Sequence, residues 1–307
     1  MSVAPESSLQ LWLPALAAMD ATHPLRTMLA RADRLPDASR GYLGGLNDYF
    51  SGLDANLPAA PLTRELLAGD AGDHLWLSAD PAWVQPDLNG VRLLACGKLQ
   101  LEMDEAQAFA ESLQPVFDEA GFALHVSSPD RWHLRLPPGT TMPALAAPEQ
   151  ALGEDLSQHL PQGQEGRSWR ILLNEIQVLL HQHPQNAERS MRGLPPINSL
   201  WLWGGGQLPH HVESRLLGVI SDDVLLRALA RRAGLPDRPR VADTVTQSGR
   251  GWLIDLQDLP SMEIASAWWA TLQKLFERQS VTLHFADGSC WRHKPWHRWR
   301  FWRGAGR

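Results

Sequence analysis

The chain has 307 residues, 44% of them hydrophobic and 20% charged, so it can bury one large core or two ordinary ones. Its net charge of -6 argues against a surface wholly devoted to nucleic acid, and its two cysteines, Cys96 and Cys290, form neither a CxxC motif nor a disulfide framework. No apolar run approaches the ~20 residues that span a bilayer, and the first residues lack a secretory pattern, so a cytoplasmic protein without a membrane span is expected.

The first 72 residues show only loose periodicity. Apolar residues spaced through the first 35 positions predict a helical hairpin or a strand that leads into a helix. Residues 41–72 are rich in Gly, Ala, Pro, Asn and Asp, and Pro58 and Pro61 interrupt regular structure there. This part is therefore expected to be loop with one short helix.

A compact unit with the order β-α-β-β is predicted next. Its apolar runs are typical of strands at 74–78, 91–95, 122–126 and 132–136. The helix that begins at Asp104 has apolar residues at i, i+3, i+4 and i+7 through four turns, and Gly121 ends it. Residues 127–130 form the turn between the last two strands. A small sheet with a helix on one face is therefore expected, followed by a proline-rich loop over 137–168.

Helices and a strand are predicted beyond this loop. Ser168 is placed to cap a helix with one apolar stripe that Pro184 ends, and Asn186 is placed to cap a shorter helix. A strand that reads as buried follows and ends in three glycines, 204–206. The side chains of Ser221-Asp222-Asp223 then predict the start of another helix, because acidic groups complement the helix dipole there.

The C-terminal part alternates strand and helix. Residues 251–256 and 281–285 predict strands on either side of a helix over 262–277, a spacing typical of a parallel crossover unit. The whole order of elements predicts a mixed α/β architecture with a smaller inserted α+β unit. The expected boundaries are 1–72 with 161–307 for the α/β core, and 73–160 for the insertion.

The segment 183–209 carries the most informative pattern in the chain. It joins the residues His-Pro-Gln-Asn-Ala-Glu-Arg at 183–189 and Gly-Leu-Pro-Pro-Ile-Asn at 193–198 to the strand that ends at Gly206. A polar, anion-competent turn followed by a buried strand and glycines is a way in which an α/β sheet opens a loop close to a ligand. The alternative is that the glycines only let a tight turn pass a neighbouring element.

This compound pattern resembles archaeal-type, cofactor-independent phosphoglycerate mutase, whose sequences carry a similar His-Pro-x-Asn-x-x-Arg turn, Gly-x-Pro-x-x-Asn step and Gly-x-Gly strand end. Residues 218–235 look like the family's next strand and helix. Residues 75–136 resemble its inserted domain, with Arg131-Trp132-His133 similar to a Tyr-Arg-His strand. Within the family, the 198–206 strand and the 296–301 tail look like those of RpfE-type bacterial regulatory proteins, named for the regulation of pathogenicity factors. The resemblance implies a fold of the alkaline-phosphatase superfamily.

The resemblance also implies a reaction that uses two divalent metals held by Asp and His, and a Ser that accepts the phosphoryl group. This chain departs from that pattern. The first strand, at 9–14, lacks the family's Asp, and Asp258 and Asp287 stand alone where the family has Asp and His together. Two carboxylates without histidines make a poor transition-metal site and would hold magnesium weakly, and an isolated Asp at a strand end is commonly a loop cap. The two-metal site is therefore expected to be lost.

A ligand site kept from the family would use the polar and glycine residues of these segments. The guanidinium groups of Arg131 and Arg189 match carboxylate and phosphate in a planar fork. The candidate ligand-binding residues are Arg131, His133, His183, Asn186, Arg189, Asn198, Trp203, Gly204 and Gly206. The expected ligand is a phosphorylated or acidic small molecule. The alternative is that Asn186 and Asn198 only cap backbone turns.

The tail from Trp291 to Arg307 interleaves arginine and lysine with aromatic residues and has no acidic residue. This spacing suits single-stranded nucleic acid or an anionic membrane surface. The alternation around 298–301 also describes a final strand with aromatic residues inward and arginines outward. The structural interpretation is favoured, and nucleic-acid binding is left open.

These observations support three hypotheses. The leading one is a cytoplasmic regulatory or ligand-binding protein on a degenerate phosphoglycerate-mutase-like scaffold, with no two-metal catalysis and no cofactor. The first alternative is an active phosphoglycerate mutase or phosphatase with rearranged ligands, which would need Mn, Co or Mg. The second is a nucleic-acid-binding regulator that uses the tail. The sequence sets no oligomeric state.

Overall fold

The computed structural model describes residues 8–53, 56–87, 90–300 and 302. The chain forms two compact units, which we call the terminal unit (1–53 with 211–307) and the middle unit (54–210). The middle unit extends beyond the predicted insertion at both ends. At the C-terminal end this is because β8 (Ser199–Gly206) pairs with β4 (Leu75–Asp87), a strand more than 100 residues earlier in the chain.

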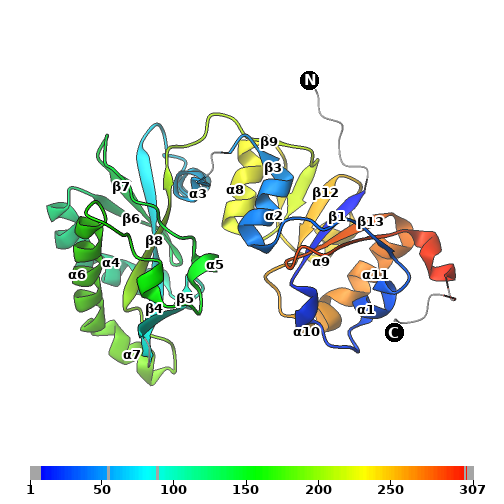
Figure 1. The fold of residues 1–307 in the computed structure, drawn as a ribbon, viewed down its shortest axis with the longest axis horizontal. Coiled ribbons are helices and arrows are strands. Elements are labelled where there is room, and N and C mark those ends of the chain that lie inside the picture. Colours follow the sequence, from blue (N-terminus) through cyan, green and yellow to red (C-terminus); the bar gives the residue numbers. More distant parts are fainter. Residues whose placement is uncertain (1–7, 54–55, 88–89, 301, 303–307) are drawn as a thin grey trace. The chain divides into compact units, whose positions relative to one another are not determined.

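A mixed sheet forms the centre of the terminal unit (Figure 1). Its strands lie in the order β11 (Asp237–Arg238), β10 (Gly218–Ile220), β12 (Trp252–Asp255), β1 (Leu9–Leu13), β13 (Val281–Phe285), β14 (Cys290–His293) and β2 (Asp33–Arg34). The pairs from β11 to β13 are parallel, whereas β14 and β2 are antiparallel to their neighbours. The predicted strand-helix-strand crossover is thus confirmed, with β1 between its two strands. A separate short ladder pairs β3 (Phe50–Ser51) with β9 (Glu213–Ser214).

Helices cover both faces of this sheet (Figure 1). They are α1 (Pro24–Leu29), α2 (Gly41–Tyr49), α8 (Val224–Arg232), α9 (Ala242–Thr246), α10 (Ser261–Glu263), the π-helix η3 (Ile264–Trp268), α11 (Trp269–Arg278), and the 3-10 turns η1 (Leu16–Ala18) and η4 (Pro295–Trp299). Because side chains alternate along a strand, Leu9, Leu11 and Leu13 pack on one face with residues of α1, α9 and α11. Trp12 lies on the other face, where its ring stacks on Tyr42 of α2. No helix in the described ranges is long and apolar enough to cross a bilayer.

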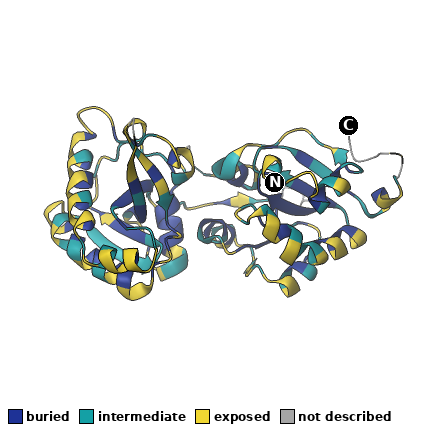
Figure 2. Ribbon diagram, turned by 90° about the horizontal axis from the view of Figure 1, so that it is seen from below, coloured by how far each residue is buried: buried dark blue, intermediate teal, exposed yellow. Residues whose placement is uncertain are grey.

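The middle unit has an antiparallel sheet in which β4 pairs with β5 (Gly90–Cys96), β7 (Arg131–Leu136) and β8, and β6 (Ala123–Ser128) pairs with β7. Its helices are α3 (Ala59–Ala68), α4 (Met103–Glu119), α5 (Pro148–Ala151), α6 (Arg167–His181) and α7 (Gln185–Met191), with the 3-10 turn η2 (Leu156–Gln158). Apolar residues of α4 and α6 pack with Trp132 and Leu134 of β7, while His133 faces α3. Burial is concentrated in the strands and the inner helix faces (Figure 2).

Several local predictions were wrong for identifiable reasons. Residues 41–72 contain both α2 and α3 rather than one short helix, because Pro58 precedes α3 and Pro61 lies in its first turn, where a missing N–H costs little. Gly166, not Ser168, is the N-cap of α6, and Asn186 lies inside α7 rather than at its cap.

The final strand predicted around 298–301 is also wrong. The strand of this segment is β14, which ends at His293, and η4 follows it. Trp299 is 64% exposed instead of packed inward, and residue 301 lies outside the described residues.

Candidate functional site

Arg131, Asp80 and Trp203 form a polar cluster in the middle of the antiparallel sheet. Arg131, on β7, forms an ion pair with Asp80 of β4, and its guanidinium carbon lies 5.6 Å from the centre of the Trp203 ring on β8. The Trp203 indole N–H donates to Asp80 Oδ2 at 2.8 Å. Asp80 is fully buried, and burial raises its pKa despite the nearby Arg131 charge. The sheet thus holds the Arg131 side chain in one orientation through two partners.

Asp80 and Asp130 each have a carboxylate oxygen, Oδ1, that is buried without a hydrogen-bond partner within the described structure. Burial raises the pKa of Asp130 as well. The adjacent turn contains Lys98 (φ 49) and Gln100 (φ 55), and non-glycine residues in the left-handed region are often found at functional sites. Sequence reasoning missed Asp80. The available signal was an acidic residue in the middle of a strand whose neighbouring positions are mostly apolar.

His133 lies in a closed network instead of facing a ligand cavity. Its Nδ1 and Nε2 atoms hydrogen-bond to Ser127 Oγ at 2.7 Å and to Thr63 Oγ1 at 2.9 Å. Burial, with a smaller effect from the Arg64 charge, lowers the pKa of His133 to about 3, so the imidazole is neutral at pH 7. Arg64 also donates to Ser127, at 2.9 Å, and pairs with Asp70. Both ring nitrogens therefore already have protein partners.

Asn186 and Asn198 hydrogen-bond to the backbone through both the oxygen and the nitrogen of their side-chain amides. Asn186 donates to the carbonyls of Leu180 and Ile197 at 2.7 and 2.9 Å, and accepts from the Ile197 N–H at 2.8 Å. Asn198 accepts from the Val84 N–H at 2.9 Å and donates to its carbonyl at 2.7 Å, beside the irregularity in the β4–β5 pairing. These contacts agree with the backbone-capping alternative. A ligand role for either residue stays a prediction.

His183 and Arg189 are also used within the protein. The His183 Nδ1 accepts from the Gln185 N–H at 3.3 Å at the start of α7. Arg189 is fully buried, pairs with Glu105 at 3.2 Å and donates to the Leu99 carbonyl at 2.6 Å. Of the candidate ligand residues with a guanidinium, Arg131 is the one whose side chain is partly exposed, at 23%.

Gly204 and Gly206 let β8 pass close to the start of α3. A Cβ at Gly204 would lie 2.7 Å from the Ala59 Cβ, and one at Gly206 would lie 2.9 Å from the Pro58 Cβ. Both distances are shorter than carbon atoms tolerate, so packing alone requires glycine here. This agrees with the alternative in which the glycines let a turn pass a neighbouring element.

Gly204→Ala is expected to lower the free energy of unfolding by about 2–4 kcal/mol, because it adds an overpacked methyl group to a left-handed backbone. Gly193→Ala is the matched control: Gly193 has a similar φ of +70° but open space around it, so only the backbone cost of about 1 kcal/mol is expected. Urea unfolding followed by fluorescence measures both. Equal losses would show that the contact with Ala59 is not what requires glycine.

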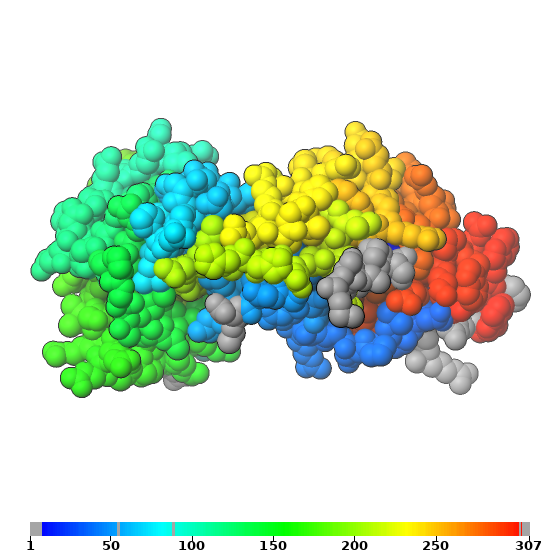
Figure 3. Space-filling model, turned by 90° about the horizontal axis from the view of Figure 1, so that it is seen from above, coloured from blue at the N-terminus to red at the C-terminus, as the bar shows by residue number. Residues whose placement is uncertain are grey.

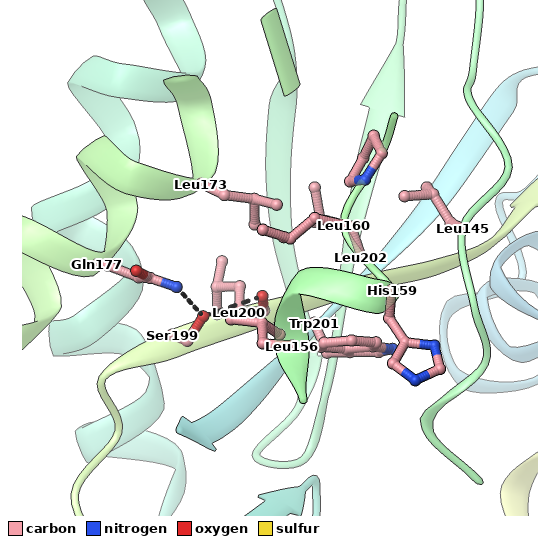
Figure 4. Close-up of a pocket in the computed structure, with 11 residues that line it drawn as sticks. Leu145, Leu156, His159, Leu160, Leu173, Gln177, Ser199, Leu200, Trp201 and Leu202 are labelled. Carbon is pink, nitrogen blue, oxygen red and sulfur yellow. Dashed lines mark hydrogen bonds between the residues drawn. The ribbon is translucent and has the colours of Figure 1, made fainter. Parts of the chain in front are cut away.

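A pocket in the middle unit lies between α6, η2 and β8 (Figure 4). Leucine side chains, Trp201 and His159 line it, and the Gln177 amide reaches Ser199 Oγ at 3.3 Å on one side. Its volume of about 20 Å³ is close to that needed for one water molecule. It is too small for a phosphorylated metabolite.

In the terminal unit, polar residues gather at the carboxyl ends of the parallel strands, where α/β folds commonly bind ligands. Asp255 ends β12 and is fully buried. It accepts from Ser221 Oγ at 2.7 Å and from the Gln257 N–H at 3.1 Å. Burial and the charge of Asp223 raise the pKa of Asp255 to about 7. Sequence reasoning missed this residue because a strand-ending Asp inside an apolar run looks like an ordinary boundary.

Arg240 lies among the acidic groups of this edge. It pairs with Asp258 at 2.5 Å and with Asp222 at 3.5 Å, and it donates to the Asp255 carbonyl at 3.0 Å. Burial acts to lower the pKa of Arg240, but the bond and charge of Asp258 outweigh it and raise the pKa. A fixed guanidinium therefore supplies positive charge at this edge.

Asp287, the other predicted remnant of a metal ligand, is used as a loop cap. Its Oδ1 accepts from the Ser289 N–H at 2.9 Å, and its Oδ2 accepts from the Leu16 N–H at 3.0 Å. Across the ranges that the structure describes, no three His, Cys, Asp or Glu side chains are grouped to hold a metal ion. The residues present at this edge do not fit a site for two divalent metals.

The C-terminal segment combines exposed aromatic rings with arginines. Trp296 and Trp299 are 52% and 64% exposed, with the Arg300 guanidinium carbon 4.4 Å from the centre of the Trp296 ring and that of Arg298 5.1 Å from Trp299. Arg300 also pairs with Asp33. These arginines thus have aromatic or acidic partners within the protein, and nucleic-acid binding by this segment stays the second alternative.

No family model matches the chain. Curated proteins similar to it include a probable 2,3-bisphosphoglycerate-independent phosphoglycerate mutase of Geobacter sulfurreducens, 36% identical over 96 residues, and a 2,3-bisphosphoglycerate-independent phosphoglycerate mutase of Methanothrix thermoacetophila, 32% identical over 111 residues. The matches cover 30% and 34% of this chain, and 24% and 28% of those proteins. The chain thus matches about a quarter of the length of these relatives.

Two solved structures are similar to this one over most of its length. A cofactor-independent phosphoglycerate mutase from Thermoplasma acidophilum has a TM-score of 0.41 and 16% identity, and the similarity covers 94% of this chain and 90% of that chain. The PH0037 protein from Pyrococcus horikoshii has a TM-score of 0.49 and 12% identity, with 95% and 88% covered. The sequence matches support a phosphoglycerate-mutase-like scaffold at low identity and partial coverage.

Proposed function

We propose that this chain is a regulatory or ligand-binding protein of the RpfE type, on a phosphoglycerate-mutase-like scaffold that works without two-metal catalysis and without a cofactor. The observation that carries the proposal is Arg240, which bonds to carboxylate and carbonyl oxygens at the carboxyl edge of the terminal-unit sheet. The similarity to phosphoglycerate mutases supports the scaffold.

An arginine can balance the charge of carboxylates but cannot replace the two divalent ions of a phosphoryl-transfer site. Two divalent ions stabilise phosphoryl transfer because each offers open coordination positions to the attacking or leaving oxygen. A guanidinium balances the charge of Asp258 and Asp222 but offers only N–H donors, and its donors here are directed at protein oxygens. Asp255, the buried carboxyl of the same edge, accepts hydrogen bonds from Ser221 Oγ and from the Gln257 N–H, both within the protein.

For the ligand, we propose a phosphorylated or acidic small molecule that contacts Arg131. A guanidinium held by Asp80 and Trp203 loses little side-chain entropy when it binds an anion, because its orientation is set before binding. Lys98, in the strained turn beside Asp130, would add positive charge at this place. The other candidates among His183, Asn186 and Arg189 would support the backbone around the site.

The purified protein is expected to show no metal-dependent conversion of 3-phosphoglycerate to 2-phosphoglycerate with Mn²⁺, Co²⁺ or Mg²⁺, but to bind 3-phosphoglycerate in calorimetry. Arg131→Gln is expected to weaken binding at least about tenfold, since a charge-assisted hydrogen bond contributes roughly 1.5–3 kcal/mol.

Arg135→Gln is the control for this experiment, because Arg135 is an exposed arginine of the same strand. It should bind like the unmodified protein. Turnover that requires metal and stops with a chelator would overturn the non-catalytic proposal. Binding that is equal in the Arg131 and Arg135 variants would overturn the assignment of the ligand to Arg131.

A further inference from the structure

A second site candidate lies in the terminal unit, away from the carboxyl edge. A pocket of about 250 Å³ is formed by α1, α11 and the segment that joins β14 to η4. Figure 3 shows the C-terminal segment, in red, at the surface of the terminal unit beside the orange of α11. His293 lines the pocket and pairs with Val281, the first residue of β13. The pocket is therefore near the start of the parallel strands, at the edge opposite Asp255 and Asp287.

Aromatic rings form much of the pocket wall. Trp269 and Phe276 of α11 lie with their ring centres 6.2 Å apart, and the Phe276 and His293 rings meet edge to face at 5.3 Å. Met28 of α1 and Pro295 add apolar surface. A cavity of 150 Å³ is enough to hold benzene, so this volume suits a flat molecule of one or two rings.

The charged residues of the pocket favour an anionic group on the ligand. Arg31, two residues after the end of α1, and Arg298 of η4 both line it, against Glu277 as its acidic residue in the described structure. Arg31 donates to the backbone carbonyl of Arg298 at 3.1 Å, so the Arg31 guanidinium lies beside η4. A carboxylate is the anion whose planar shape suits guanidinium donors.

The His293 ring adds an uncharged surface to the pocket wall. The residue is 94% buried, because its exposed fraction is 6%. Burial lowers the pKa of His293 to about 4, so the ring is neutral at pH 7 and adds no charge beside the arginines.

The helix that carries the aromatic wall is also irregular at this point. The residues Ile264–Trp268 form a π-helix that ends directly before Trp269. π-Helical turns are rare, change which side chains share a face, and occur frequently at functional sites. This irregularity is independent of the pocket's volume and charge.

We propose that this pocket binds a small planar aromatic carboxylate. The rings of Trp269 and Phe276 would contact the aromatic body, and Arg31 and Arg298 would contact the carboxylate. This site is separate from the Arg131 cluster and does not depend on the function proposed for it.

Calorimetric titration of the full chain with indole-3-carboxylate tests the proposal. We expect a dissociation constant on the order of 0.1 mM, which is typical of the ligand efficiency of such a small molecule. Arg298→Gln is expected to weaken binding about tenfold, because Arg298 is exposed and its loss removes one charge contact without affecting the core. Gln273→Trp, which fills the pocket from the exposed side of α11, is expected to abolish binding.

The controls separate this site from general binding to a tryptophan-rich protein. Arg278→Gln changes an exposed arginine of α11 that does not line the pocket, and it should bind like the unmodified chain. Indole, which lacks the carboxylate, should bind more weakly and be insensitive to Arg298→Gln. Absence of binding up to the solubility limit of the probe, or binding that survives Gln273→Trp in a folded variant, would overturn the proposal.

Discussion

Replacing Arg189 by Met is expected to lower the free energy of unfolding by about 3–5 kcal/mol, because it leaves a buried carboxylate without its buried partner. Arg189 is fully buried, pairs with Glu105 at 3.2 Å, and donates to the carbonyls of Leu99 and Pro195 at 2.6 and 2.9 Å. Methionine keeps much of the side-chain volume but satisfies none of these oxygens. The measurement is chemical denaturation, with the transition of the middle unit analysed by itself.

Arg192→Met is the matched control, since Arg192 pairs with the other oxygen of Glu105 at 2.7 Å but is 51% exposed. Exposed ion pairs contribute about 0–1 kcal/mol, so the loss should stay within that range. Adding Glu105→Gln to the Arg189 variant should recover part of the stability, because the unpaired charge is then removed. Equal losses for the two arginine variants would contradict the larger contribution to the fold expected of the buried Arg189.

Asp255→Asn is expected to change the pH dependence of stability more than any other single substitution at the carboxyl edge. Because burial raises the pKa of Asp255 to about 7 in the folded protein, the folded state holds a proton that the unfolded chain releases above about pH 4. Stability therefore falls as the pH rises from about 4 to about 7. A shift of this size corresponds to a loss on the order of 4 kcal/mol. Asparagine, always neutral, should abolish that loss.

The measurement is the difference in unfolding free energy between variant and unmodified protein at each pH. This difference cancels the opposite effect of buried histidines such as His133 and His284, whose pKa values are lowered by burial to about 3 and about 4. The variant should gain stability relative to the unmodified protein as the pH rises. A difference that stays constant from pH 4 to 8 would show that Asp255 is ionised across this range.

Asp237→Asn provides a control of opposite sign. Although burial acts to raise its pKa, bonds to Arg231 and Arg227 hold the pKa of Asp237 below its ordinary value. The folded state therefore favours the ionised carboxylate, and that stability is present above about pH 4 and lost as the pH falls through the lower folded pKa. The cost of Asp237→Asn should thus be largest near neutral pH and shrink in acid.

Local sequence patterns predicted most of the individual elements. The apolar spacing from Ala106 to Phe117 predicted α4, which the structure gives as Met103–Glu119, and the strand-helix-strand spacing predicted β12 and β13 as parallel strands. These features depend on residues within a few turns of one another. The boundary of the middle unit was not predicted, because it depends on pairing of β8 with β4 across more than 100 residues.

The residues that meet at the candidate sites are likewise far apart in the chain, so local patterns did not predict their contacts. Arg131 and Trp203 were selected from a motif, but the residue that joins them, Asp80, lies 51 positions before Arg131 and 123 before Trp203. Likewise, Asp258 was recognised as an isolated carboxylate, whereas its partner Arg240 was not considered. Periodicity carries no information about side-chain pairs that distant strands bring together.

Local patterns were thus enough to predict the α/β class, most helices and strands, and the resemblance to phosphoglycerate mutases. How the polar residues are used became evident from the folded chain: Asn186 and Asn198 bond to the backbone, Gly204 lacks the Cβ that would collide with Ala59, and Arg240 lies among the acidic groups of the sheet edge. Secondary structure follows from short-range periodicity and backbone preferences. The role of a polar side chain follows from which partner burial places within hydrogen-bond distance, and that is set by the packing of the whole chain.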